Sequence, residues 1–458
     1  MTQQQTLTEQ IPTEKTDGTQ TLRPVLAVVY GPVTELFGNR LVLDSTTVAI
    51  GRNTPLFFGK PLNDPRISGH HADVTVTGDQ RLHIVDQGSK NGTFVDEDRI
   101  SEITIPHGGF VQFGRTTLRY LVEPAFDWHA GNSPLVGISH AMAQVRDGIR
   151  AAARHHRPVL IEGPSGSGKE PTAQEIHRQS GRSGRFVAVN CAALPKELME
   201  SELFGHAEGA FTGAKSKKIG LFAAAHLGTL FLDEFTEMPL DLQPKLLRAI
   251  QDGRIRAVGA TEERAVDVRI VAATNRNALD CVKNETLRLD LYGRLRGGLI
   301  RTPALADRPE DIGVLSRLLL GRAGLGHADL SPGLLWALLR HSWPFNVRGL
   351  EHILLTASAE LTNNSLNLTP DVVRMLNQER ELLRPESLDD TPDIRQTTGD
   401  TAHTATTTTA SPPDHDTLVA LLAQHRGVVS KVAATLSVHR FQVYRWIRAM
   451  EIDIDVFR

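Results

Sequence analysis

A glycine-rich loop at residues 163–170, GPSGSGKE, constrains the fold of this chain more than any other segment. It follows the apolar run VLIEG and precedes a segment with helical patterning, so it fits G-x-x-x-x-G-K between a strand and a helix. Backbone N–H groups and the positive end of the helix converge there on phosphate oxygens, and Lys169 reaches the terminal phosphates. We therefore expect a nucleotide-binding parallel α/β sheet. The phosphate loop consists of Gly163, Pro164, Ser165, Gly166, Ser167, Gly168, Lys169 and Glu170.

Polar residues end two further strand-like runs downstream of this loop. GTLFLDE ends in Asp233 and Glu234, and VRIVAATN ends in Asn275. At the edge of the sheet, Asp233 is the expected ligand of Mg²⁺, and Glu234 is the expected base that polarises the attacking water. Asn275 is expected to face the γ-phosphate. Glu170 stands where the loop pattern usually has Ser or Thr, so the hydroxyl ligand of Mg²⁺ is missing.

Composition excludes several classes of protein. The 458 residues include 50 Lys and Arg against 53 Asp and Glu, which excludes a globally basic nucleic-acid coat, so any nucleic-acid surface must be local. Two cysteines exclude a disulfide framework and a four-cysteine zinc site. No apolar run reaches the roughly 18 residues of a membrane span, and the N-terminus lacks the apolar core of a signal peptide. We expect a cytoplasmic protein without a membrane partner.

Shifts in composition predict a multidomain chain. Short β-favouring runs separated by turn signals predict an all-β sandwich, and alternating strand and helix patterns predict the α/β core. A stretch rich in Thr, Asp and Pro is typical of a linker. The expected segments are a disordered tail (1–24), the sandwich (25–124), the α/β core (134–305), a helical lid (306–377), the linker (378–413) and an all-α module (414–458).

The segment GAFTGA, between the two nucleotide motifs, resembles the loop of the same sequence in bacterial enhancer-binding proteins. These are AAA+ ATPases that activate the sigma-54 form of RNA polymerase, and the resemblance covers roughly residues 134–377. It implies that the loop contacts sigma-54. Its flanking glycines give a pliable tip, and an exposed phenylalanine at a loop tip is costly unless something binds it. The loop residues are Gly209, Ala210, Phe211, Thr212, Gly213 and Ala214.

The resemblance implies roles for four more residues. Asn190, in VNCAAL, is similar to the family's switch asparagine, which holds the catalytic glutamate. Arg288 and Arg294, in LRLDLYGRL, are similar to the arginine pair donated across a subunit interface, where a guanidinium stabilises charge on the γ-phosphate. Arg348, in WPFNVRGLE, is similar to the second sensor in the lid. Gly293, Leu287 and Leu289 depart from the family pattern around the arginines.

Gly51-Arg52, Ser68-Gly69-His70-His71 and Asn91-Gly92-Thr93 resemble the motifs of a forkhead-associated (FHA) domain. The resemblance implies that loops at one end of the sandwich bind phosphothreonine. Gly69 removes a charge that family members often carry, so a sandwich that has lost phosphopeptide binding is the alternative. The expected phosphothreonine-binding residues are Arg52, Ser68, Lys90 and Asn91.

Residues 414–458 have the pattern of three helices, and the span 426–448 holds five Lys or Arg and no acid. A basic helix after a short turn is typical of a helix-turn-helix, and it resembles the Fis-type module of enhancer-binding proteins. The alternative is a small helical hairpin that caps the lid. The expected DNA-binding residues are Lys431, Arg440, Gln442, Tyr444 and Arg445.

Together these features predict an ATP- and Mg²⁺-dependent activator of sigma-54 RNA polymerase that binds upstream enhancer DNA. Arginines donated in trans imply a homo-oligomer, and the resemblance implies a hexamer. The FHA domain would respond to a phosphothreonine protein or to an internal phosphorylated segment. One alternative is a phosphopeptide-regulated DNA-binding repressor with a non-hydrolysing AAA+ ring. Another is an AAA+ unfoldase or loader for other proteins.

Overall fold

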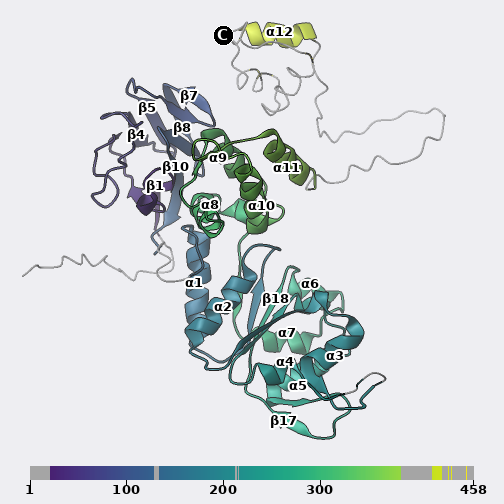
Figure 1. Cartoon of the computed structure of the whole chain (residues 1–458). Coiled ribbons are helices and arrows are strands. Elements are labelled where there is room, and N and C mark those ends of the chain that lie inside the picture. Colours follow the sequence, from purple (N-terminus) through teal and green to yellow (C-terminus); the bar gives the residue numbers. More distant parts are fainter. Residues whose placement is uncertain are drawn as a thin grey trace, which may run out of the picture. The chain divides into compact units, whose positions relative to one another are not determined.

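The computed structural model describes residues 21–127, 134–211, 214, 216–382, 415–424, 432, 435 and 450. The chain divides into two compact units, Met1–Pro385 and Glu386–Arg458. The first unit contains a β-sandwich, an α/β core and a helical lid (Figure 1). The second contributes the helix α12 (His415–Gln424). Within the described part of the chain, no helix combines the length and the apolar character needed to cross a bilayer.

The predicted sandwich is confirmed, and it consists of two antiparallel sheets. One sheet has the order β2-β1-β10-β9-β6-β7, and the other has the order β3-β4-β5-β8. Ala72 and Val74 of β4 point into the core, as do Leu82 and Ile84 of β5. The strands are β1 (Leu22–Tyr30), β2 (Arg40–Val42), β3 (Val48–Ile50), β4 (Ala72–Val76), β5 (Leu82–Asp86), β6 (Thr93–Val95), β7 (Asp98–Ile100), β8 (Glu102–Ile105), β9 (Phe110–Phe113) and β10 (Thr116–Pro124).

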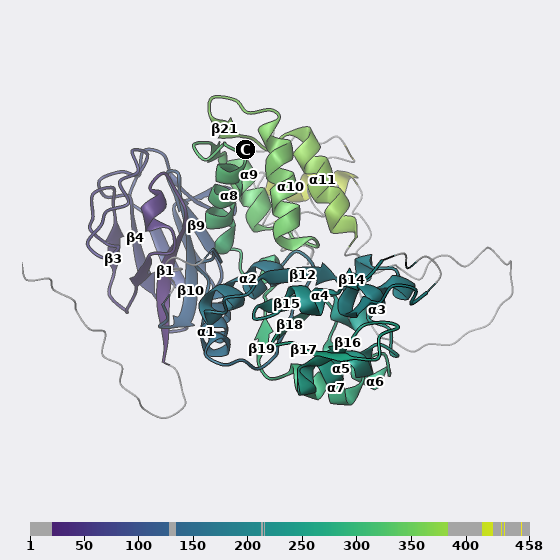
Figure 2. The ribbon, with the colours of Figure 1, turned by 60° about the horizontal axis from the view of Figure 1, so that its bottom comes forward.

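A parallel sheet forms the α/β core, with the order β12-β15-β18-β11-β19 (Figure 2). The central strand β18 is buried at every position, because both faces of the sheet are covered. Ile161 and Phe231 pack with α1 and α2 on one face, while Leu160 and Leu230 belong to the cluster on the other. The strands are β11 (Val159–Glu162), β12 (Phe186–Asn190), β15 (Thr229–Asp233), β18 (Arg269–Thr274) and β19 (Leu299–Arg301).

Helices and two short hairpins complete the core. The expected alternation of strands and helices is confirmed, and the carboxyl ends of β11, β15 and β18 meet at one edge of the sheet. The helices are α1 (His140–Ala153), α2 (Lys169–Ser180), α3 (Lys196–Phe204), α4 (Leu221–Ala224), α5 (Gln243–Asp252), α6 (Ala278–Lys283) and α7 (Leu289–Leu295). The hairpins are β13 (Gly205–His206) with β14 (Lys218–Ile219), and β16 (Arg254–Arg256) with β17 (Glu263–Ala265).

The lid is helical, with one addition that the sequence pattern does not predict. A short parallel pair, β20 (Asp329–Leu330) and β21 (Ser365–Leu366), joins the loops that precede α9 and follow α10. Each strand has only two residues, which is too short for an alternating pattern to be recognised. The lid helices are α8 (Asp311–Arg322), α9 (Pro332–Leu339), α10 (Asn346–Ser358) and α11 (Pro370–Glu381).

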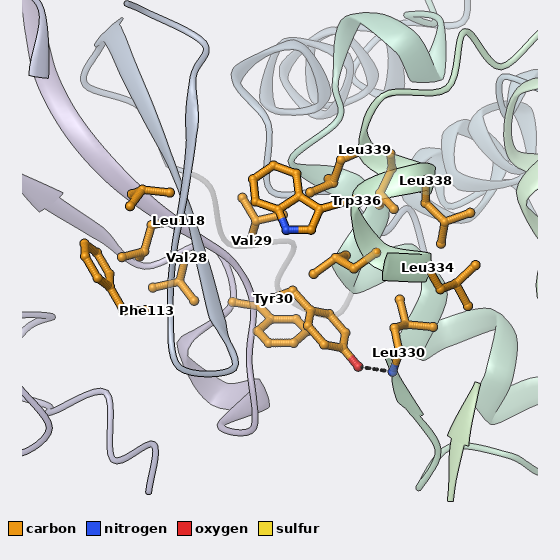
Figure 3. Packing of buried hydrophobic residues seen from close by; sticks show 14 of the residues in the cluster. Val28, Val29, Tyr30, Phe113, Leu118, Leu330, Leu334, Trp336, Leu338 and Leu339 are labelled. Carbon is orange, nitrogen blue, oxygen red and sulfur yellow. Dashed lines mark hydrogen bonds between the residues drawn. The ribbon is translucent and has the colours of Figure 1, made fainter. Parts of the chain in front are cut away.

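The sandwich and the lid share one hydrophobic core (Figure 3). Trp336 of α9 is 1% exposed and lies against the sandwich, while the hydroxyl of Tyr30 accepts a hydrogen bond of 2.7 Å from the backbone N of Leu330. A Cβ added at Gly313 of α8 would lie 2.1 Å from the carbonyl oxygen of Val29, so β1 lies too close to α8 for a side chain at this position. The two domains therefore pack as a continuous body.

Ion pairs surround this shared core. Arg119 of β10 pairs with the buried carboxylate of Glu310, just before α8. Arg340, at the end of α9, pairs with Asp96 at 3.2 Å and Glu97 at 3.0 Å, in the turn between β6 and β7. The contact therefore combines an apolar centre with charged pairs at its margin, as in specific protein interfaces.

Candidate functional site

The phosphate loop lies between β11 and α2, where the sequence predicts it. Gly166 and Gly168 have φ of +74° and +109°, a region that favours glycine. Lys169 is 7% exposed, and its Nζ donates to the carbonyl oxygens of Gly163 at 3.1 Å and Pro164 at 3.4 Å. The loop thus holds the ammonium group at its centre, facing the end of β15.

A cleft of about 420 Å³ opens beside this loop, between the core and the lid. Its lining combines apolar residues before α1 and on α8 with charged residues of the phosphate loop, the end of β15 and the lid. This combination suits a nucleotide, whose base is apolar and whose phosphates are anionic. The charged or polar lining residues are Ser165, Ser167, Lys169, Glu170, Gln174, Asn190, Asp233, Glu234, Arg308, Arg322, Arg348 and Glu351.

The two predicted carboxylates lie at the end of β15. Burial raises the pKa of Asp233, and the neighbouring Glu234 raises it further, while Lys169 opposes both effects. Glu234 accepts a hydrogen bond of 3.0 Å from the backbone N of Asn275 and pairs with Lys169 at 3.4 Å. The structure therefore brings together Lys169, Asp233, Glu234 and the end of β18. Negative charge exceeds positive charge here, which fits a divalent cation held by Asp233.

Asn190 lines the same cleft but has a local partner in this structure. Its side-chain oxygen accepts a hydrogen bond of 2.9 Å from the backbone N of Ala192 and so caps a short 3-10 turn. Glu234 is instead held by Lys169 and Asn275. The contact between Asn190 and Glu234 that the family resemblance implies is therefore not formed here.

Arg288 and Arg294 lie away from the cleft of their own chain. Arg288 precedes α7 and forms a two-point ion pair with Asp290, with distances of 2.8 and 3.1 Å. Arg294 is exposed in the last turn of α7. Neither residue is among those that line the cleft.

The lid contacts the phosphate loop through residues that the sequence patterns did not single out. Asn346 donates from its side-chain nitrogen to the carbonyl oxygen of Ser165 at 2.9 Å, and Arg308 donates to that of Ser167 at 2.8 Å. Arg308 is buried, and the nearby Asp311 accepts hydrogen bonds from Ser139, just before α1. The available signals were indirect: Asn346 lies inside the segment WPFNVRGLE, and Arg308 and Asp311 have the spacing i, i+3 of a helix-end pair. Arg348 itself lines the cleft from α10, as predicted.

The GAFTGA segment lies between β13 and β14, away from the phosphate loop in the sequence. The backbone N of Gly209 donates to Ala214 at 2.8 Å, and that of Ala214 donates to Phe211 at 2.9 Å. Phe211 is 42% exposed, and its ring lies edge-on to His206 with the centroids 5.0 Å apart. Thr212 and Gly213 lie outside the described residues, while Ala210 takes part in the turn at the start of the loop.

Three loops at one end of the sandwich bring the predicted phosphothreonine residues together. Arg52 donates to the carbonyl oxygens of Ile67 and Pro65, both at 2.8 Å. The hydroxyl of Ser68 accepts from the backbone N of Lys90 at 3.1 Å. The side chain of Asn91 donates to a backbone oxygen of the Ser68 loop at 2.7 Å.

The tight packing of these loops depends on a glycine. A Cβ added at Gly51 would lie 2.0 Å from the carbonyl oxygen of Gly69, so the loops that carry Arg52 and Ser68 need glycine at position 51 to approach this closely. Buried His71 joins two of the loops, because its Nδ1 accepts from the backbone N of Ser68 at 3.0 Å and its Nε2 lies 3.2 Å from the carbonyl oxygen of Gly92.

Of the expected DNA-binding module, the structure describes mainly α12. Leu418 and Leu422 of this helix are buried, one turn apart, which agrees with an amphipathic helix. The predicted DNA-binding residues all lie outside the described residues. They are Lys431, Arg440, Gln442, Tyr444 and Arg445.

Comparisons with known proteins identify two regions. Residues 135–301 match the model of the Sigma-54 interaction domain, and residues 48–114 match that of the FHA domain. The nitric oxide reductase transcription regulator NorR1 of Cupriavidus necator is 42% identical over 272 residues, which are 58% of this chain and 52% of that protein. The formate hydrogenlyase transcriptional activator of Salmonella typhimurium is 37% identical over 330 residues, which are 70% of this chain and 45% of that protein.

The chain spans about half the length of these curated relatives. Among solved structures, NtrX from Brucella abortus in complex with ATP is 30% identical, with 71% of each chain covered and a TM-score of 0.48.

Proposed function

We propose that ATP hydrolysis by this chain remodels the closed complex of sigma-54 RNA polymerase. The chain belongs to the sigma-54 interaction domain family, and its FHA domain precedes that domain in the sequence. The network of Lys169, Glu234 and Asn275 at the mouth of the nucleotide cleft carries this proposal. In this network the ammonium group would bind the phosphates, and the adjacent carboxylate would polarise the attacking water.

Each residue of the cleft has a distinct task in this scheme. Lys169 binds the β- and γ-phosphates, and the loop N–H groups orient them. Mg²⁺, held by Asp233, would neutralise part of the phosphate charge. Glu234 orients and deprotonates the attacking water, and Asn275 keeps that carboxylate in place through its backbone N–H.

Completion of the site requires a second copy of the chain. Arg288 and Arg294 do not line the cleft of their own protomer, so we assign them to the γ-phosphate bound by a neighbour. Head-to-tail contacts of this kind close into rings, and we propose a hexamer. Asn190 would bind Glu234 in another nucleotide state, after it leaves the cap that it forms here.

Force would reach the polymerase through the loop that contains Phe211 and Thr212. Partial exposure of the Phe211 ring supports a contact with another protein, because an apolar ring in water is unfavourable. Residues 414–458 would bind upstream enhancer DNA. The FHA domain would bind a phosphothreonine protein or an internal phosphorylated segment, and its packing on the lid gives that binding a route to the ATPase.

One observation favours a second candidate function. Glu170 replaces the hydroxyl residue that follows the loop lysine, and such a loss is compatible with a ring that binds ATP without hydrolysing it. The chain would then act as a phosphopeptide-regulated DNA-binding repressor.

A reconstituted transcription reaction separates the two functions. Purified chain, sigma-54 polymerase and a promoter with its upstream site are incubated with ATP or with a non-hydrolysable analogue. The proposed function requires phosphate release and open complexes with ATP alone. Binding of both nucleotides without phosphate release would favour the repressor.

A further inference from the structure

A second cleft, of about 270 Å³, lies at the junction of the sandwich and the lid. Arg66 and Arg115 line it from the sandwich, and Ser331 and Asn363 line it from the lid. Tyr30, whose hydrogen bond to Leu330 is drawn in Figure 3, also lines this cleft. None of the roles proposed above uses this cleft.

A buried carboxylate fixes the two arginines at the cleft. Asp64 is 0% exposed, and its Oδ1 accepts a hydrogen bond of 2.9 Å from the backbone N of Arg66. Its Oδ2 accepts from the backbone N of Arg115 at 2.7 Å and from the hydroxyl of Thr116 at 3.1 Å. One side chain therefore holds the loop before Ser68 and the turn between β9 and β10 together, with an exposed arginine on each.

The charged residues that line the cleft are Arg66, Arg115 and Asp329, so positive charge exceeds negative charge there. Among the described residues, no carboxylate forms an ion pair with the side chain of Arg66 or Arg115. The one carboxylate that lines the cleft, Asp329, is paired with Arg317 at 2.6 Å. Helix α9 begins at the cleft, with Ser331 as its N-cap, and a helix N-terminus adds positive potential. This environment favours an anionic ligand.

The cleft and the phosphothreonine loops share one segment of the chain, which carries Arg66 and Ser68. Arg66 lies two positions before Ser68, and its carbonyl oxygen accepts the hydrogen bond from the side chain of Asn91. A peptide whose phosphothreonine is bound by Arg52 and Ser68 would therefore have its neighbouring residues beside Arg66.

We propose that this cleft binds an acidic residue that flanks the phosphothreonine, so that one peptide contacts the FHA domain and the AAA+ lid together. The proposal rests on the proposed phosphothreonine binding by the FHA domain. The two guanidinium groups supply the charge, and Ser331 and Asn363 supply polar contacts from the lid.

Binding in this cleft is coupled to the nucleotide site through the lid. Ser365 of β21 lines the cleft, and β21 packs against α10, which carries Arg348 to the nucleotide. A ligand whose affinity differs between the ATP-bound and the ATP-free position of the lid changes the affinity for ATP, and ATP changes the affinity for that ligand by the same factor. A peptide that contacts only the FHA loops lacks this effect.

An oriented peptide library tests the specificity. The library has one fixed phosphothreonine and degenerate flanks, and it is captured on the full chain and sequenced. The wild type is expected to enrich Asp and Glu at one or more flanking positions, by about two- to fivefold for each arginine. The double variant Arg66→Ser, Arg115→Ser should lose the enrichment but still capture phosphothreonine peptides.

A matched control removes the same charge elsewhere on the sandwich. The double variant Arg23→Ser, Arg81→Ser changes two exposed arginines that do not line the cleft, and it should keep the acidic enrichment. Equal loss of the acidic enrichment in both double variants would mean that the net charge of the protein, not the cleft, selects the peptide. That result would overturn the proposal.

The lid contact is tested by ATP affinity. The dissociation constant of a fluorescent ATP analogue is measured with an enriched acidic phosphopeptide and with its Asn/Gln counterpart. The acidic peptide is expected to shift the constant about fivefold or more, and its counterpart is not. Equal effects of both peptides would overturn the lid contact.

The outcomes separate this proposal from the function of the FHA domain. Phosphothreonine capture without a flanking preference would overturn the cleft and leave the FHA function intact. Failure of the wild type to capture any phosphothreonine peptide would overturn the phosphothreonine function itself, and the cleft with it.

Discussion

The indole nitrogen of Trp336 donates a hydrogen bond of 3.0 Å to the side-chain oxygen of Gln112, and both residues are buried between the lid and the sandwich. A buried acceptor that loses its donor costs about 1–3 kcal/mol, because water cannot replace the partner. The sandwich therefore depends on the lid for part of its stability.

The variant Trp336→Phe tests this dependence. It should lower the free energy of unfolding by about 1–3 kcal/mol and increase amide exchange in β9, measured by mass spectrometry. Trp343→Phe is the matched control, because the Trp343 indole donates to the Leu338 carbonyl within the lid. Faster amide exchange in β9 of Trp343→Phe, or no increase in that exchange in Trp336→Phe, would contradict the prediction.

Hydrolysis should depend on Glu234 far more than nucleotide binding does. In Glu234→Gln the side-chain oxygen can still accept from the backbone N of Asn275, so the geometry of the cleft is retained while the base is lost. We expect unchanged ATP affinity and a kcat lower by about 100-fold or more. Glu237→Gln, which changes a carboxylate paired with Arg276, should turn over normally. Near-normal turnover of Glu234→Gln would reject its role as the base.

ATPase activity and transcription should separate at Phe211. The ring packs against His206 and is far in the sequence from the phosphate loop, so Phe211→Ala should keep most of the ATPase activity. It should fail to form open complexes at a sigma-54 promoter in a purified system. Phe58→Ala is a suitable control, because Phe58 is also exposed but belongs to the sandwich. Parallel loss of ATPase and transcription by an assembled Phe211 variant would argue against a contact with sigma-54.

Active sites should be shared between subunits. Arg294→Ala and Lys169→Ala are each expected to be inactive, because one lacks the donated charge and the other lacks the phosphate contact. Mixing them creates interfaces at which an intact loop faces an intact arginine, so part of the ATPase activity should return. Absence of any recovery, after subunit exchange is demonstrated, would exclude the donated role.

Low pH should destabilise the packing of the phosphothreonine loops, because it favours protonation of His71. The backbone N of Ser68 can only donate, so Nδ1 of His71 accepts and Nε2 carries the proton that is donated to Gly92. Burial lowers the pKa of His71, with a partial opposing effect of the Gly92 contact and Asp86. The unfolded chain therefore binds a proton more readily than the folded chain does. The contribution of neutral His71 to the free energy of unfolding is complete above about pH 6.5, and it falls as the pH drops below that value.

Denaturant unfolding of the wild type and of His71→Gln measures this effect between pH 7.5 and 5. The wild type should lose stability below about pH 6.5 by up to about 1.4 kcal/mol per pH unit more than the variant. Identical pH profiles of the two chains would contradict the assignment.

Local motifs predicted the nucleotide site, whereas contacts between distant segments were not predictable. The loop around Lys169 and the carboxylates that end β15 are each encoded in fewer than ten residues, so the sequence indicates their chemistry and their place on the sheet. Arg308 and Asn346 reach the phosphate loop from the lid, and no short pattern records that approach.

The same reasoning applies to the contact between the two domains. Trp336 follows the pattern of an ordinary lid helix, and its partner Gln112 lies on a strand of the sandwich. A helical pattern shows which face of α9 is apolar, but not which domain covers it. Residues 25–30 of β1 are all buried, and the lid contributes to this burial by packing against Val29 and Tyr30.

Because the docking of β1 on α8 requires a position without a side chain at Gly313, the N-terminal sandwich cannot be combined freely with the lids of other proteins of this kind. Even the methyl group of an alanine at this position would collide with the carbonyl oxygen of Val29. A recombination event that joined this sandwich to a lid with a larger residue there would produce a chain whose two domains fold but cannot dock. A designer who grafts a new sensor onto the lid must therefore either keep the glycine or rebuild the whole contact.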